Sequence, residues 1–450
     1  NSLDKKGLIK IFRKPVIPNI YETSLESEPK KIKLTNDQKN SISVICNSLD
    51  QNIFDPYLLH GVTGSGKTEV FIEASKHAIK QNKSVVVLLP EISTTPQIAG
   101  RFKSVFGDSV AVWHSKLSKP SRAWIWKKIC NGDFKIIVGA RSAIFTPLKN
   151  LGLIIVDEEQ EDAYKQTSPS PKYHAKEVSL MRGKINKATV ILSSATPSLE
   201  TYFNYKSNKF KYLELPKRFG NAKLPYVHLV NMIDEYKTTE NHDTIFSQLM
   251  LDKINDRIKK NEQVILLHNR RGFAPILRCD DCGEISQCPH CLLSLTFHKT
   301  DNMLKCHFCN FTKSPTGKCT NCSSFNGRLS GTGTQKIEEE IAKLFPDTAI
   351  DRLDLDAAPT AQKIFHTLNK FSKNEINILV GTQMIAKGLD FPNATLVGII
   401  NADTGLFLPD FRSGEKVFQL IYQAAGRAGR GSVPGEVIVQ TFNSDNTIIN

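Results

Sequence analysis

The sequence predicts an α/β protein with two parallel-sheet lobes and a cysteine-rich insertion in the second lobe. Apolar strand-like runs alternate with helical stretches over residues 34–215, and the alternation resumes from residue 244. Strands that alternate with helices form parallel sheets with both faces covered. Eight of the 10 cysteines interrupt the second series, within residues 276–329. The block follows the first strand-like run of that series, so we expect it to be inserted between the first and second strands of the second sheet.

Each expected strand is a short apolar run that ends at polar residues, glycine or proline. The first series contains, in order, "DPYLLHG", "SVVVLLP", "SVAVWHS", "KIIVGA", "LGLIIVD" and "ATVILSSAT". The second series contains "EQVILLHN" and then, after the cysteine block, "AIDRLDLD", "INILVGT", "ATLVGIIN" and "GEVIVQT".

These patterns divide the chain into five parts. We expect a tail of a preceding module with a linker (1–33), a first lobe that binds ATP (34–215), a polar connector (216–243), a second lobe (244–275 and 330–450) and a zinc-binding insertion (276–329).

Length and charge narrow the class of protein. The chain has 450 residues and a net charge of +14, which favours a nucleic acid as partner over charge that serves solubility alone. No run of about 18 apolar residues predicts a membrane span, and no signal peptide is recognisable, so we expect a cytoplasmic protein. Because the chain begins at Asn1 and stops at Asn450 after a strand-like run, we expect it to be part of a longer protein.

A glycine-rich loop follows the first strand-like run. "GVTGSGKT" has the phosphate-loop spacing G-x-x-x-x-G-K-[ST], in which backbone amides face phosphate oxygens. Lys67 is expected on the β- and γ-phosphates and Thr68 on Mg²⁺. The expected nucleotide-binding residues are Gly61, Thr63, Gly64, Ser65, Gly66, Lys67 and Thr68. Gln38, upstream of the loop, either contacts the adenine edge or lies on a helix surface.

Carboxylates end the strand-like run "LGLIIV". Asp157 and Glu158 stand where Mg²⁺–nucleotide binds at the carboxyl edge of a parallel sheet. Asp157 is expected to hold the metal and Glu158 to orient and deprotonate the attacking water. Arg427 and Arg430, three apart in "QAAGRAGRG" of the second lobe, are expected to reach across and stabilise charge on the γ-phosphate.

The cysteine block contains four Cys-x-x-Cys pairs. Eight thiolates fill two closed tetrahedral zinc sites, which are structural rather than catalytic. Disulfides and an iron–sulfur cluster are the alternatives, and the rest of the chain favours a cytosol where thiols stay reduced. Spacing alone does not choose between nested and sequential pairing. The expected ligands are Cys279, Cys282, Cys288, Cys291, Cys306, Cys309, Cys319 and Cys322.

Taken together, these motifs resemble the PriA family of bacterial replication-restart helicases. The resemblance runs from about residue 30 to the end of the chain. It rests on the cysteine block and on "GVTGSGKTEV", "LLPEISTTPQ", "VGARSAIFTP", "DEEQ", "SSATPS", "NRRGFAP", "GTQMIAKGLDFPN", "PDFR" and "QAAGRAGRG".

The resemblance implies two RecA-like lobes of a superfamily 2 helicase, with ATP, Mg²⁺ and two Zn²⁺ as cofactors. It also implies a 3′→5′ DNA helicase that recognises forks, recombination loops and single strands, and works with single-strand-binding protein and primosome proteins. The cysteines would pair in nested fashion, Cys279/Cys282 with Cys319/Cys322. Where the family usually has Asp-Glu-Glu-His, this chain has Gln160 in the last place, which puts the coupling of hydrolysis to DNA in doubt.

Three further segments are candidates for DNA contact. Tyr164, Lys165, Tyr173, His174 and Lys176 lie in a proline-broken loop, where aromatics among cations can stack on bases and neutralise phosphates; a packed surface loop is the alternative. The cysteine block adds Phe297, His298, His307, Phe308 and Phe311, which either wedge a duplex or dock a partner, or pack against the cysteine turns. Asn269, Arg270 and Arg271 precede the block and are expected to contact phosphates, with a salt bridge between the lobes as the alternative.

Two rival functions stay open on the sequence. One is a double-strand DNA translocase that remodels nucleoprotein without unwinding. The other is a zinc-dependent DNA-binding module whose ATPase is inert. The intact Lys67, Asp157, Glu158 and Arg430 argue against this second rival.

Overall fold

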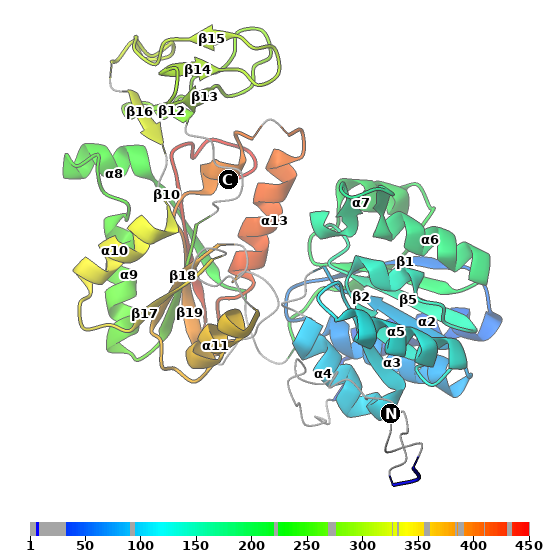
Figure 1. Ribbon diagram of the computed structural model, residues 1–450. Helices are drawn as coiled ribbons and strands as arrows, with labels where there is room; N and C mark the ends of the chain where they lie inside the picture. Colours follow the sequence, from blue (N-terminus) through cyan, green and yellow to red (C-terminus); the bar gives the residue numbers. More distant parts are fainter. Residues whose placement is uncertain are drawn as a thin grey trace.

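In the computed structural model the chain forms two α/β lobes, and a small antiparallel domain projects from the second lobe (Figure 1). The structure describes residues 6–8, 33–90, 95–219, 224–268, 276–325, 327–330, 333–354, 361–382, 385, 391–408, 410–429 and 434–449. The predicted fold class is confirmed. None of the described helices is long and apolar enough to cross a bilayer.

The described part of the first lobe has one parallel sheet of seven strands. Their order is β3 (Val110–Trp113), β4 (Ile136–Gly139), β2 (Ser84–Leu88), β5 (Leu151–Asp157), β8 (Thr189–Ser194), β1 (Pro56–Gly61) and β9 (Lys211–Leu215). Six of the strands were predicted, and β9 was not. A two-stranded hairpin, β6 (Lys165–Gln166) with β7 (Tyr173–His174), lies outside the sheet.

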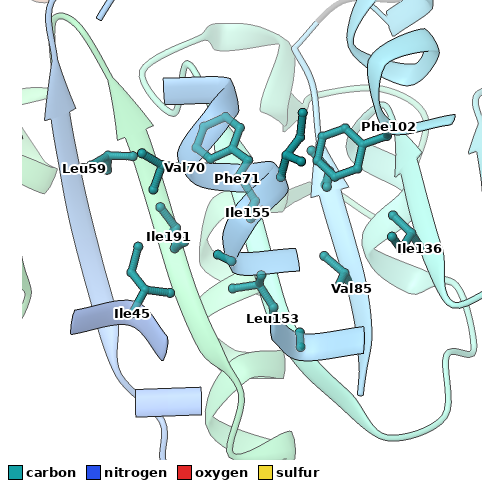
Figure 2. Packing of buried hydrophobic residues seen from close by; sticks show 14 of the residues in the cluster. Ile45, Leu59, Val70, Phe71, Val85, Phe102, Ile136, Leu153, Ile155 and Ile191 are labelled. Atoms are coloured by element: carbon teal, nitrogen blue, oxygen red, sulfur yellow. The ribbon is translucent and has the colours of Figure 1, made fainter. Parts of the chain in front are cut away.

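The central strands are buried along their whole length because helices cover both faces of the sheet. Val85 and Val87 of β2 pack into one core with Phe71, whereas Val86 and Leu88 pack into a second core on the other face. Figure 2 shows the first core between the sheet and the helices over it. This double burial explains why the strands are continuous apolar runs instead of alternating ones.

Polar caps mark where several helices of the first lobe begin. Thr35 and Gln38 form a capping box on α2, Ser118 caps α5, and Ser198 caps α7. The helices are α2 (Asn36–Gln51), α3 (Lys67–Lys80), α4 (Thr95–Phe106), α5 (Lys119–Asn131), α6 (Ala175–Asn186) and α7 (Leu199–Lys206). Short 3₁₀ turns occur at η1 (Gly107–Ser109), η2 (Arg141–Phe145) and η3 (Asp162–Tyr164).

The second lobe has a parallel sheet of six described strands. Their order is β10 (Tyr226–Asn231), β20 (Glu436–Thr441), β19 (Ala394–Ile399), β11 (Gln263–Leu267), β18 (Ile378–Gly381) and β17 (Ile350–Leu353). The helices are α8 (Met232–Thr239), α9 (Gln248–Lys259), α10 (Thr334–Leu344), α11 (Ala361–Ser372) and α13 (Ser413–Ala425), with a 3₁₀ turn η4 (Ala402–Gly405).

The expected connector over 216–243 is too long. Strand β10 and helix α8 lie within it, and β10 pairs with β20 at the edge of the second sheet. Tyr226, Val227 and Leu229 of β10 are exposed, so the strand lacks the buried apolar run by which the other strands were recognised. The cysteine block consequently follows the second strand of this sheet in chain order, not the first as predicted.

The insertion is a five-stranded antiparallel sheet in the described residues. The strands are β15 (Thr312–Lys313), β14 (Met303–Lys305), β13 (Thr296–His298), β12 (Ile276–Cys279) and β16 (Gly327–Ser330). Strands β12 and β16 join it to the second lobe, and β14 and β15 lie at its far end (Figure 1).

Candidate nucleotide, zinc and DNA sites

The phosphate loop lies between β1 and α3, at the carboxyl end of the strand. Gly64 and Gly66 both have φ of 79°, a left-handed conformation that favours glycine. A Cβ on Gly66 would lie 2.3 Å from Nε2 of Gln38. Lys67 Nζ donates to the carbonyl of Gly61 at 2.7 Å, so the ammonium folds back over the loop at the N-terminus of α3. A helix N-terminus with a nearby cation is suited to bind phosphate.

Gln38 at the start of α2 contacts the phosphate loop. Its side chain is fully buried, so the interpretation as a helix-surface glutamine is wrong. Nε2 donates to the carbonyl of Ser65 at 2.8 Å, and Oε1 accepts from the backbone N–H of Thr35 at 2.9 Å. The amide thus joins the start of α2 to the phosphate loop, while contact with adenine stays a prediction.

Asp157 stands at the carboxyl end of β5, opposite Ser193 of β8. Its Oδ1 is buried and has no hydrogen-bond partner in the described residues. Burial and the neighbouring Glu158 raise the pKa of Asp157 to about 7, and Lys67 opposes this rise. A buried carboxylate oxygen without a donor fits a divalent cation, which would stabilise the charge that burial disfavours. Asp157 therefore suits a divalent cation such as Mg²⁺, while the contact of Thr68 with the same ion stays a prediction.

Gln160 connects the acidic turn to the segment after β8. Its Nε2 donates to Glu158 at 2.8 Å, and its Oε1 accepts from the hydroxyl of Ser194 at 2.6 Å. The Ser194 oxygen in turn accepts from the backbone N–H of Thr196 at 2.8 Å. Glu158 has φ of 49°, an uncommon conformation for a residue with a side chain. The amide of Gln160 therefore holds the carboxylate of Glu158, which is expected to orient water. The same amide holds Ser194, the residue before "ATPS".

The arginine segment of the second lobe lies against the phosphate loop. A Cβ on Gly426 would lie 2.3 Å from Oγ1 of Thr63, so the backbones approach closely where the segment leaves α13. Arg427 follows directly and is half-buried. Arg430, the other predicted arginine, lies outside the described residues.

Polar contacts extend the junction between the lobes. Arg218 donates to the carbonyl of Ala428 at 3.2 Å, and Gln423 donates to Glu161 at 3.3 Å. Lys416 of α13 forms an ion pair with Asp162 at 2.8 Å. The sequence analysis missed these partners, because each pair is separated by more than 200 residues and no local spacing connects them.

The four cysteine pairs adopt one repeated backbone turn. In each, the carbonyl of the first cysteine accepts from the N–H four residues later, at 2.9 to 3.0 Å. The residue after the second cysteine has positive φ in every case: Gly283 (76°), Leu292 (57°), Asn310 (59°) and Ser323 (62°). Such turns direct two thiols and several N–H groups to the same side. For Cys306, N–H donation from Cys309 and Phe308 lowers the thiol pKa to about 7.

The eight sulfurs gather in two groups of four, and within each group they lie within 4.8 Å of one another. One group joins the outer pairs, with Cys279 and Cys322 sulfurs 3.6 Å apart, and the other joins the inner pairs, with Cys288 and Cys309 sulfurs 3.5 Å apart. A zinc tetrathiolate has sulfurs about 3.8 Å apart at a Zn–S distance of about 2.3 Å. The geometry fits two zinc sites in nested pairing, and the sulfurs are too far apart for disulfides.

Two of the predicted DNA contacts are internal. Tyr164 is fully buried beneath the acidic turn, and its hydroxyl donates to the carbonyls of Leu88 and Asp157. Lys176 is buried too and binds Glu159. The prediction that these two residues contact DNA is therefore wrong, because aromatic and cationic side chains that alternate in the sequence are here buried by internal partners. Lys165 is exposed, Tyr173 packs on Phe145, and the His174 ring caps α6.

The predicted DNA contacts in the insertion also include both packed and exposed residues. Phe297 and Phe311 pack against its small core, whereas Phe308 is 80% exposed. His298 and His307 approach each other, with Nε2 atoms 3.3 Å apart. Asn269, Arg270 and Arg271 lie outside the described residues.

Comparisons with protein families agree with this architecture. Residues 35–204 match the family described as DEAD/DEAH box helicase, and residues 331–432 match the helicase conserved C-terminal domain. Residues 288–313 match the PriA DNA helicase Cys-rich region domain.

Several curated proteins are similar over nearly the whole chain. The replication restart protein PriA of Bacillus subtilis is 43% identical, over 98% of this chain and 54% of its own length. Those of Chlamydia pneumoniae and Synechocystis are 42% and 40% identical, over 100% of this chain and 60% and 54% of their lengths. The chain therefore spans little more than half the length of these relatives.

Solved structures with a similar fold include RecG bound to a three-way DNA junction, with a TM-score of 0.53 and 17% identity over 92% of this chain and 43% of that one. Mycobacterium smegmatis Lhr bound to single-stranded DNA and AMP-PNP has a TM-score of 0.52 and 14% identity, over 91% and 46%. At such low identity these two structures support the fold alone.

Proposed function

This chain belongs to the PriA family of replication restart proteins, and from that premise we propose that it is the motor of an ATP-dependent DNA helicase. It would move 3′→5′ on one strand and act at stalled forks and recombination loops during replication restart. One observation carries the proposal. The phosphate loop and the arginine segment belong to different lobes, yet Gly426 lies against Thr63 of the loop. Hydrolysis at a junction of two lobes is what allows ATP to drive their relative movement.

The roles of the side chains follow from their positions. Lys67 would stabilise the β- and γ-phosphates, with Thr68 and Asp157 on Mg²⁺, which supplies charge neutralisation when bound. Glu158, held by Gln160, would orient the attacking water and accept its proton. Arg427 and Arg430 would stabilise the charge of the transition state from the second lobe.

The insertion supports DNA unwinding over simple translocation. It is a separate body that projects from the second lobe, exposes Phe308 and has two groups of four thiols, which would hold zinc and stiffen it. Such a body can separate strands as the motor advances. Single-strand-binding protein and primosome proteins are the expected partners, as in the family.

The test is Lys67→Ala in the full-length protein, with DNA-stimulated phosphate release and strand displacement as readouts. We expect both to be abolished and the affinity for DNA to stay within a few-fold, because Lys67 contacts the nucleotide site. Lys80→Ala is the matched control, since Lys80 is exposed at the opposite end of α3. Turnover of Lys67→Ala close to wild type would refute the assignment. If the wild-type protein hydrolysed ATP without displacing a strand, the double-strand translocase would be favoured. If the wild-type protein did not hydrolyse ATP, the zinc-dependent binding module would be favoured.

A further inference from the structure

Glu159, in the middle of the acidic turn, is buried and faces the start of α7. Its side chain is 0% exposed. Oε1 accepts from the backbone N–H of Ser198 at 2.7 Å, and Oε2 accepts from the hydroxyls of Ser198 and Thr201 at 3.0 and 2.8 Å. Three donors from the start of α7 therefore converge on one carboxylate.

Lys176 compensates the buried charge. Its Nζ donates to Glu159 at 3.0 Å and to the hydroxyls of Ser198 and Thr201, both at 3.1 Å. Lys176 belongs to the first turn of α6, so the ion pair joins the acidic turn, α6 and α7 in one polar cluster. A buried ion pair persists when hydrogen bonds satisfy both partners, as here, and it defines geometry more than it adds stability.

The start of α7 is also where the second lobe makes contact. The backbone N–H of Leu199 donates to Glu415 of α13 at 3.1 Å, and Glu200 forms an ion pair with Arg412 just before α13. Both residues follow Ser198 directly. Any shift of α7 relative to the acidic turn would move the surface on which the second lobe rests.

We infer that Glu159 is a positioning residue that couples the acidic turn to the lobe junction through α7. Gln160 fixes Ser194 and Glu159 fixes Ser198, so the turn holds the segment between them at both ends. A displacement of Glu158 on binding of the γ-phosphate would therefore move α7, and the contact of α7 with α13 would move the second lobe. The inference rests on the proposed function and adds a route by which the nucleotide site controls lobe contact.

The test removes one oxygen of the cluster. Glu159→Gln is unsuitable alone, because it leaves the charge of Lys176 buried and risks unfolding. Thr201→Val replaces the hydroxyl by a methyl group of similar size, and Thr201→Ser retains the hydroxyl as a matched control. Arg412→Ala removes the ion pair with Glu200, one of the contacts that α7 makes with the second lobe. The wild-type protein, the single variants Thr201→Val and Arg412→Ala, and the double variant form a cycle, measured in the full-length protein as kcat and KM of DNA-stimulated ATP hydrolysis.

We expect Thr201→Val to lower kcat about tenfold and to change KM less than twofold, since Thr201 is buried and its hydroxyl bonds to Glu159, Lys176 and Ser198. Thr201→Ser should keep kcat within twofold. The double variant should be no worse than the poorer single variant, because both changes break the same connection. The inference would be overturned if the losses of kcat in the two single variants multiplied in the double variant, or if Thr201→Val kept the wild-type kcat. Either result would leave the proposed function intact. A wild-type protein without DNA-stimulated hydrolysis would instead refute the proposed function.

Discussion

At the scale of single residues, the acidic turn shows how a substitution within a family motif can preserve geometry. Gln160 occupies the place where the family usually has histidine. Its amide donates to Glu158 and accepts from Ser194. A neutral imidazole likewise offers one donor and one acceptor. Gln160 therefore forms the bridge between Glu158 and Ser194 that a histidine could form. What the substitution can change is how strongly this bridge holds, and with it the coupling of hydrolysis to DNA.

Gln160→Ala removes the bridge between Glu158 and Ser194. We expect DNA-stimulated kcat to fall about tenfold or more, the scale of a misplaced catalytic group, with nucleotide affinity nearly unchanged. Gln160→His should stay within a few-fold of wild type, because it restores a donor and an acceptor. Steady-state hydrolysis with saturating DNA and equilibrium binding of a nucleotide analogue provide the measurements. An unaffected kcat in Gln160→Ala would show that Glu158 needs no support from Ser194.

The phosphate loop, the acidic turn and the eight cysteines could be located from sequence because their chemistry imposes short fixed spacings. Tyr164 and Lys176 could not, since composition does not reveal burial when the partners are Leu88 and Glu159. Gln38 shows the same limit, because its contact with Ser65 depends on how α2 packs below the loop.

At the scale of elements, the insertion is attached to the second lobe through its outer zinc site. A Cβ on Gly283, next to Cys282, would lie 2.5 Å from the carbonyl of Phe442. Arg278 stacks on the Phe442 ring at 3.3 Å from its centroid. Arg328 of β16, the cross-strand partner of Arg278, forms an ion pair with Asp243 at 2.7 Å. The inner site lies toward β14 and β15, at the end away from the lobe (Figure 1).

Loss of the inner site should therefore loosen the projecting end and leave the motor largely intact. We expect Cys306→Ser or Cys288→Ser to keep most DNA-dependent ATPase activity, to impair strand displacement or partner loading, and to lose about one of two zinc ions by metal analysis. Cys130→Ser, outside the insertion, is the control and should lose none. If ATPase and unwinding fell together in every cysteine variant, the insertion would belong to the folding core of the motor.

Nested pairing adds a stricter count of metal. Cys279 and Cys319 lie in the same group of four sulfurs. The Cys279→Ser/Cys319→Ser double variant should therefore lose no more zinc than either single variant. Loss of both ions in the double variant would support sequential pairing and contradict the geometry.

Elements with a buried apolar run were predicted close to their observed bounds, because parallel strands between two helix layers admit few polar residues. Strands β9 and β10 were missed because they lie at sheet edges and are half-exposed, with charged or aromatic residues on the outer side. The connector was too long for the same reason.

At the scale of the whole molecule, polar side chains join the two lobes near the expected nucleotide site. Lys416 with Asp162, Arg412 with Glu200, and Gln423 with Glu161 all join α13 or the residue before it to the first lobe. Exposed ion pairs contribute little stability each. Such a junction can open and close at low cost, which is what a motor that cycles between states requires.

We expect the arginines to stabilise the γ-phosphate more in the transition state than in the ground state. The segment leaves α13 at Gly426, against Thr63, and continues through Arg427 toward Arg430. We expect Arg430→Ala to keep nucleotide affinity within a few-fold and to lose turnover by about 10³-fold or more, the scale of a finger arginine. Arg430→Lys keeps the charge without the planar fork and should recover only part of the loss. Titration with a nucleotide analogue separates binding from turnover. If affinity collapsed in Arg430→Ala, the arginine would contact the nucleotide in the ground state, and its predicted role in stabilising the transition state would be refuted.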